Sequence, residues 1–226
     1  MPDHLVDQPV LDSDTVEALR EILDDPALPV GTTAALAGGD RASKLREAHD
    51  FLSTHRIAAT AARSRAAAVD LLAALGEVDP ALAASLRGHT VLAPVLTGLP
   101  PTRARNALLG NIHRGELITW VPAVESWTWF DAVVPADDAP IGRVDAVFET
   151  GELPSLYNHL VLWEPVAAAL VVVPTHRDRI DWEAVGPDGS RWRVRLSRAV
   201  FHVNDLIPLD TDPTALPDRP ESAETT

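Results

Sequence analysis

Hydrophobic residues are spaced differently in the two halves of this 226-residue chain, and the change falls near residue 116. Before it, leucine and alanine recur at the three- and four-residue spacing of helices that bury one face. After it, short β-branched or aromatic runs alternate with turn residues, the pattern of a sheet or barrel. All six tryptophans lie beyond residue 119. The pattern predicts an α+β protein, with an N-terminal helical bundle followed by a mainly antiparallel β-barrel domain.

About five helices are expected in the first half. Asp12 supplies a helix N-cap, and Asp79 followed by Pro80 predicts another helix start, because proline suits the first helical position. Gly76 is the expected C-cap of a long alanine- and leucine-rich helix, and Pro94 is expected to interrupt helical structure. The expected helices cover residues 15–23, 40–51, 57–75, 80–86 and 102–113.

The second half contains seven predicted strands, at residues 118–121, 127–134, 144–150, 157–162, 168–173, 180–184 and 191–203. Residues 135–140 and 186–189 carry strong turn signals of proline, glycine and aspartate. From residue 210 the chain is rich in proline, acids and threonine, so a disordered tail is expected. The predicted division is therefore 1–115 helical domain, 116–209 β-barrel domain and 210–226 tail.

Charge and composition exclude several classes of function. The formal net charge of -14 would repel a phosphate backbone, so nucleic acid is not an expected partner. Without cysteine the chain forms neither disulfides nor thiolate metal sites. The most apolar run, residues 166–173, is far shorter than the roughly 20 residues of a membrane-spanning helix. No export signal is visible at the N-terminus. We expect a cytoplasmic protein that does not enter a membrane.

Histidine placement predicts no metal site. His49 and His55 are six residues apart and fall on different faces of a straight helix. His89 and His113 are expected to satisfy helix ends. The chain has no Gly-x-Ser-x-Gly elbow and no phosphate-binding glycine loop, so neither a serine nucleophile nor a nucleotide loop is expected.

Several segments together resemble the first two domains of acyl-CoA dehydrogenases. They are the Leu-x-x-Leu-Gly-x-x-Asp-Pro-x-Leu-Ala pattern at 72–83, His89, the Gly115-Glu116 junction, the strand at 171–174, the glycines at 186 and 189, and residues 200–208. The resemblance covers nearly the whole ordered chain. It implies a flavin cofactor, FAD, and α,β-dehydrogenation of an acyl thioester on acyl-CoA or an acyl carrier.

The resemblance also implies a flavin site just after the junction. In the family, Thr-Glu comes eight and nine residues past this glutamate, and counting from Glu116 places Val124 and Glu125 there. Valine has no hydroxyl to donate or accept, and Trp129 and Phe130 fall where the family has Gly-Ser. A shifted alignment offers hydroxyls nearby. The predicted cofactor-binding residues are Glu125, Ser126, Trp127 and Thr128.

The aromatic run at residues 127–130 has two interpretations, either contact with a flavin or acyl tunnel, or packing in a barrel core or an interface. In the family the catalytic base is a glutamate in a second helical domain after the barrel, and the polar residues 208–226 do not match one. No catalytic residue is therefore assigned. We expect an oxidoreductase subunit that is active only with a partner supplying that domain, and thus a hetero-oligomer or homo-oligomer. The alternatives are a non-catalytic partner subunit and an acyl-ligand-binding protein on a truncated scaffold.

Overall fold

The computed structural model describes residues 10–23, 39–121, 124–130, 140–150, 156–164, 168–176, 180–185, 191–202 and 205–209. Five α-helices come first: α1 (Ser13–Leu23), α2 (Gly39–Thr54), α3 (Arg65–Val78), α4 (Pro80–Gly98) and α5 (Arg103–His113), with a 3-10 helix η2 (Ala58–Ala62) after α2. The expected five helices are confirmed. The predicted tail and both turn segments fall outside the described residues, apart from Pro140.

Two of the predicted caps form. The Oδ1 atom of Asp12 accepts the Thr15 N–H at 2.8 Å. The same atom of Asp79 accepts the N–H groups of Ala81 at 2.8 Å and Leu82 at 2.9 Å. These bonds satisfy donors that the first helical turn leaves without a partner inside the helix.

Three local predictions are wrong. The expected long helix over 57–75 is split, because Ser64 caps a new helix start by accepting the Ala67 N–H at 3.1 Å. Gly76 lies inside α3, where a Cβ would sit at ordinary contact distance from Ala83, and Asp79 is the C-cap. Pro94 lies inside α4, which continues to Gly98. Seven of the 19 residues of α4 are buried, and this packing outweighs the hydrogen bond that one proline removes.

Two four-stranded sheets follow the helices. Sheet A has the order β1-β4-β5-β8, with β1 (Ile118–Val121), β4 (His159–Glu164), β5 (Ala169–Pro174) and β8 (Leu206–Pro208). Sheet B has the order β2-β3-β7-β6, with β2 (Ser126–Phe130), β3 (Pro140–Thr150), β6 (Ile180–Val185) and β7 (Arg191–His202). All described pairs are antiparallel except β1 with β4.

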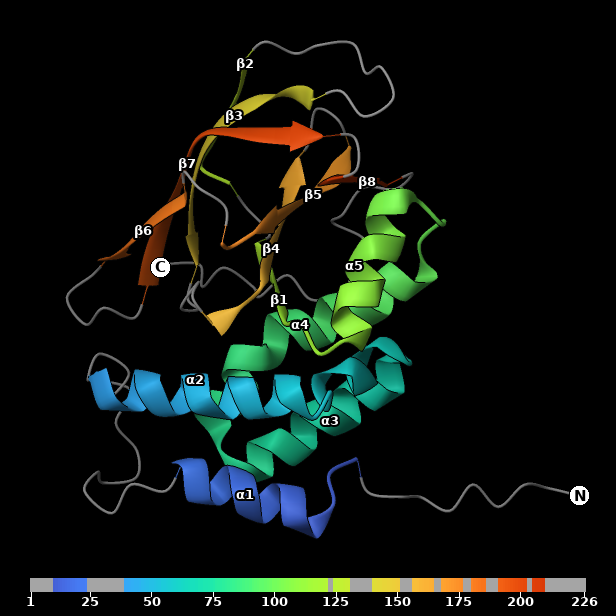
Figure 1. Ribbon diagram of the computed structural model, residues 1–226, viewed down its shortest axis with the longest axis vertical. Helices are drawn as coiled ribbons and strands as arrows, with labels where there is room; N and C mark the ends of the chain where they lie inside the picture. The colour runs from blue at the N-terminus through green and yellow to red at the C-terminus, as the bar shows by residue number, and fades with distance from the viewer. Residues whose placement is uncertain are drawn as a thin grey trace, which may run out of the picture.

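The predicted fold class is confirmed, since helices precede mainly antiparallel strands, and the strands form two stacked sheets, of which sheet B is not closed. Figure 1 shows the helices at one end, sheet A beside them and sheet B farthest away. Sheet A is buried on both faces. In β4, Val161 packs against the helical core, whereas Leu160 and Leu162 pack against sheet B.

The helical core therefore continues across the predicted boundary at residue 116. It joins the buried leucines of the helices to Ile118, Val161, Leu170, Val172 and Ile207 of sheet A. The second core lies between the two sheets and includes Phe148 and Phe201. The division into domains at 116 stays a prediction. No helix in the described part of the chain is long and apolar enough to cross a membrane.

Candidate functional site

The predicted cofactor residues lie at one edge of sheet B. Glu125 immediately precedes β2, and its backbone N–H donates to the Val147 carbonyl at 2.8 Å. Ser126 and Thr128 are exposed at alternate positions of this edge strand. Trp127 is also in β2, but its side chain lies outside the described residues, as do those of Trp129 and Phe130.

Glu125 faces a cluster of charges on the outer surface of sheet B. Its Oε1 lies 3.9 Å from Nη2 of Arg193 in β7. The same arginine atom donates to Glu149 of β3 at 2.9 Å, and Arg191 donates to Glu149 at 3.2 Å. The Glu125 side chain is 48% exposed. Water screens such ion pairs strongly, so they add little stability, but they hold the charged groups in position.

Some side chains at this edge have the chemistry that binds a flavin. The exposed hydroxyls of Ser126 and Thr128 can donate to the ring carbonyls or phosphates of a flavin. Arg193 supplies a half-exposed cation nearby. Val124, at the position that the family counting gave to threonine, packs against the core between the sheets and offers no hydrogen bond. The hydroxyls match the cofactor, but the counted threonine position does not.

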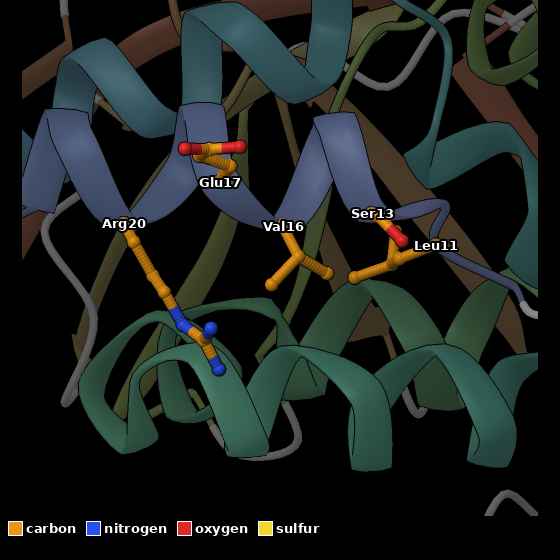
Figure 2. A pocket seen from close by; sticks show the side chains of 5 residues that line it. All are labelled: Leu11, Ser13, Val16, Glu17 and Arg20. Atoms are coloured by element: carbon orange, nitrogen blue, oxygen red, sulfur yellow. The ribbon is translucent and has the colours of Figure 1, made fainter.

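An open hollow lies elsewhere, beside α1. It has a volume of about 550 Å³ and is lined by Leu11, Ser13, Val16, Glu17 and Arg20. Figure 2 shows the side chains of Val16 and Arg20 pointing to the same side of α1, towards neighbouring helices. None of its lining residues belongs to the predicted site. This open surface is therefore separate from the edge of sheet B.

The junction of helices and sheet A contains a group of buried polar side chains. In α2, the Nδ1 atom of His49 lies 3.2 Å from the Leu156 carbonyl, and its Nε2 lies 2.7 Å from the Ser85 hydroxyl of α4. The Tyr157 hydroxyl donates to the Ser85 carbonyl. The rings of Tyr157 and His49 are arranged edge to face, with their centroids 5.8 Å apart. Burial lowers the pKa of His49 from 6.5 to about 4, so the ring is neutral at pH 7.

His89 links three elements at the same junction. It is fully buried in α4, with Nε2 3.0 Å from the Ala58 carbonyl of η2. The N–H of Ile118, the first residue of β1, donates to its Nδ1 at 3.3 Å. Burial lowers its pKa to about 4 as well. The expectation that His89 satisfies a helix end is wrong, because it lies in the middle of α4 and faces the interior.

A third histidine lies on the strand side of the junction. Nε2 of His159, which opens β4, lies 2.6 Å from Oε2 of Glu116 and 3.0 Å from the Asn111 amide nitrogen. Asn111 also accepts a hydrogen bond from Arg114. Glu116, the residue from which the family positions were counted, is thus held by a histidine rather than standing free.

This buried network was not predicted from the sequence, although one signal was present. His89 continues the apolar face of α4, since the buried residues Leu82, Leu86, His89, Ala93 and Leu96 follow helical spacing. Its partners belong to distant segments and no local pattern identifies them. Within the described residues no group of three potential metal ligands occurs.

Comparison with known proteins shows likeness in structure alone. No protein-family model matches the chain, and no curated protein does. The FMN-bound TdsC structure from Paenibacillus sp. A11-2 matches 87% of this chain and 52% of its own, at 14% identity and a TM-score of 0.52. The ChsE4-ChsE5 complex from Mycobacterium tuberculosis matches 88% of this chain and 58% of its own, at 12% identity and a TM-score of 0.49.

The likeness to TdsC is one of fold. It extends over most of the chain, so the helices and the sheets that follow them are arranged in a fold that TdsC shares. The chain spans just over half the length of the two solved structures that it matches. The class that the fold defines is an α+β protein, in which helices are followed by two mainly antiparallel sheets.

Proposed function

We propose that the chain is a flavin-binding, acyl-CoA dehydrogenase-like oxidoreductase subunit of the cytoplasm. The observation that carries the proposal is the shared fold over 87% of the chain with a protein whose solved structure holds FMN. A flavin accepts a hydride and so allows α,β-dehydrogenation of an acyl thioester on CoA or an acyl carrier. Either FAD or FMN satisfies the proposal.

In this proposal the edge of sheet B holds the flavin. The hydroxyls of Ser126 and Thr128 bind it, and Glu125 with Arg193 fixes the charge beside it. Trp127 of the same strand completes the predicted set. We assign no catalytic residue to this chain. A partner chain with a second helical domain supplies the base and the rest of the pocket, and the two associate as a hetero-oligomer.

The first test is the visible absorption spectrum and flavin-to-protein ratio of protein purified gently from its own host with whatever co-purifies. We expect flavin absorbance in fractions that contain a larger partner. A partner-containing complex that stays colourless after incubation with FAD or FMN would contradict the proposal.

Variants locate the site. Ser126→Ala with Thr128→Val removes both exposed hydroxyls and is expected to weaken flavin binding by about tenfold to a hundredfold, because each lost hydrogen bond costs about 1 kcal/mol. The matched control is Thr54→Val, since Thr54 is also an exposed hydroxyl residue, at the end of α2, and this change should leave binding unaltered. Flavin titration by fluorescence quenching measures both. If the double variant and the Thr54→Val control bound flavin with equal affinity, the flavin site would not be at β2.

A second candidate function has one observation in its favour. Val124 contributes to the core between the sheets, so the counted hydrogen bond to flavin has no donor there. A non-catalytic subunit, or an acyl-ligand-binding protein, retains the scaffold without that bond. A colourless chain whose partner carries all the flavin of the complex distinguishes this function from the first.

A further inference from the structure

The two ring nitrogens of His89 have fixed and opposite roles. A carbonyl only accepts, so the Ala58 oxygen at 3.0 Å requires a hydrogen on Nε2. A backbone N–H only donates, so the Ile118 N–H at 3.3 Å requires a lone pair on Nδ1. The surroundings therefore specify the neutral Nε2–H tautomer. A proton added at Nδ1 would point at the Ile118 N–H and remove the only acceptor in this contact.

His49, the other buried histidine of the junction, can take a proton without losing its contacts. Its Nδ1 donates to the Leu156 carbonyl, and its Nε2 faces the Ser85 hydroxyl at 2.7 Å. The Ser85 oxygen also lies 2.7 Å from the Leu82 carbonyl. When His49 is protonated, Nε2 donates to Ser85, whose own hydrogen turns to Leu82. No rotatable hydroxyl stands between His89 and Ile118.

Close packing leaves His89 little room to move. A Cβ on the preceding residue, Gly88, would lie 2.7 Å from the Thr119 hydroxyl and 2.9 Å from the Trp120 nitrogen. Helix α4 thus lies directly against β1 beside the histidine, as the ribbon also shows (Figure 1). An imidazolium in this position cannot turn away without displacing β1.

We propose that His89 is a proton-sensitive latch between α4 and β1, and that its protonation releases the start of β1 from the helices before the rest of the fold opens. The elements η2 and β1 bring no titratable side chain to the latch. From α2 the titratable group facing it is His49. The charged residues of α3, Arg65, Asp70 and Glu77, are exposed to water.

The one charged side chain of α4 itself is Arg87, which is exposed. Glu116, two residues before Ile118, pairs with His159 at 2.6 Å. At the far end of α4, Arg105 of α5 donates to the carbonyls of Leu96 at 2.9 Å and Thr97 at 2.6 Å. Burial holds the pKa of His89 near 4, against 6.5 in an open chain. The latch is therefore closed at neutral pH and weakens as the pH falls below 6.5.

Hydrogen exchange of the Ile118 amide, followed by NMR in the full chain, tests the latch. After correction for intrinsic exchange, its opening constant should rise about 30-fold from pH 7.5 to 5, because the open form binds the proton that the closed form excludes. In His89→Gln, which retains a donor and an acceptor without titrating, the rise should fall to less than about threefold. The matched control His49→Gln should keep the wild-type slope.

An opening constant that stays level in the wild-type protein, or a slope that persists in His89→Gln, would overturn the latch. A second measurement holds even if the glutamine variant fails to fold. Nitrogen-15 NMR of the His89 ring in the wild-type protein should show the neutral Nε2–H tautomer at pH 7 and still at pH 5 in the closed form. An Nδ1–H tautomer or a charged ring in the closed form at pH 5 would overturn the assignment.

Discussion

The two faces of sheet A are packed by different chemistry. Towards sheet B the contact is apolar, with Leu160, Leu162, Val171 and Val173 meeting Phe148 and its neighbours. Towards the helices, the interface contains buried His49 and His89 as well as apolar side chains. Each histidine makes a directional hydrogen bond to the backbone of another segment. The stability of the first interface depends on how well apolar side chains fill its volume. The stability of the second depends also on the protonation of the histidines and on the direction of their hydrogen bonds. Loss of volume and a change of pH should therefore affect the two interfaces separately.

The largest effect is expected from Phe148→Ala in the core between the sheets. Phe148 is fully buried, and removing such a ring costs about 3–5 kcal/mol through lost transfer energy and the cavity left behind. Urea unfolding at pH 7.5 and 5 measures it. Because no titratable group belongs to the described second core, the loss should be the same at both pH values. If the loss of unfolding free energy changed strongly with pH, the interface between the sheets would not be independent of protonation.

The second largest effect is expected from acid, which should destabilise the interface between sheet A and the helices. The folded pKa values of His49 and His89 lie near 4, below the unfolded 6.5, so the unfolded chain binds more protons between these values. Their contribution is complete above pH 6.5 and is lost as the pH falls towards 4. At pH 5 the loss is about 2 kcal/mol for each histidine.

Carboxylates also titrate in acid, so the comparison is with the double variant His49→Gln, His89→Gln. The difference in unfolding free energy between wild type and double variant should shrink by several kcal/mol from pH 7.5 to 5. A difference independent of pH would show that the histidines do not set the acid response.

A smaller loss is expected from Gly88→Ala, which adds one methyl group where α4 touches β1. The new Cβ meets backbone at 2.9 Å, so β1 must shift, at a cost of about 2 kcal/mol. The matched control is Gly98→Ala at the C-terminal end of the same helix, where a Cβ meets nothing within 4 Å. That control should be neutral or stabilising by up to about 1 kcal/mol. Equal melting temperatures for both variants would contradict the close approach.

The smallest effect belongs to the outer surface of sheet B. Glu149→Gln removes the negative charge that pairs with Arg191 and Arg193, together with one of its two acceptor oxygens, and should cost about 0.5 kcal/mol, since both pairs are partly exposed. The loss should vanish in 1 M salt. Glu47→Gln, at an exposed position of α2, is the control and should change nothing. A loss above about 2 kcal/mol that persists in salt would show that this surface is structural.

Local signals predicted much of the fold. Residues 118–121 form the predicted strand without change, and Asp79 caps α4 as expected. The structure differs where a distant contact decides. Pro94 is tolerated because its helix is buried, and β8, which was not predicted, is a three-residue strand held by pairing with β5. How the strands divide into two sheets depends on partners far apart along the chain.

The candidate site was harder to predict for the same reason. The edge position of Ser126 and Thr128 depends on the strand order of sheet B. The neighbour of Glu125 is Arg193, which lies on another strand far along the chain. The buried contacts of His89 likewise join three separate segments. Residue types alone showed which groups were present, and only the topology shows which of them meet.

The position of β8 in the chain has a consequence for synthesis. Sheet A needs β1 at residue 118 and also β8, which ends at residue 208. A growing chain therefore completes its helices while the apolar face that will meet sheet A still lacks most of its cover. About ninety more residues must be synthesised after the start of β1 before β8, the last strand of sheet A, is available to pair. Until then the apolar surface of the helices is open to contact with other nascent chains and with chaperones.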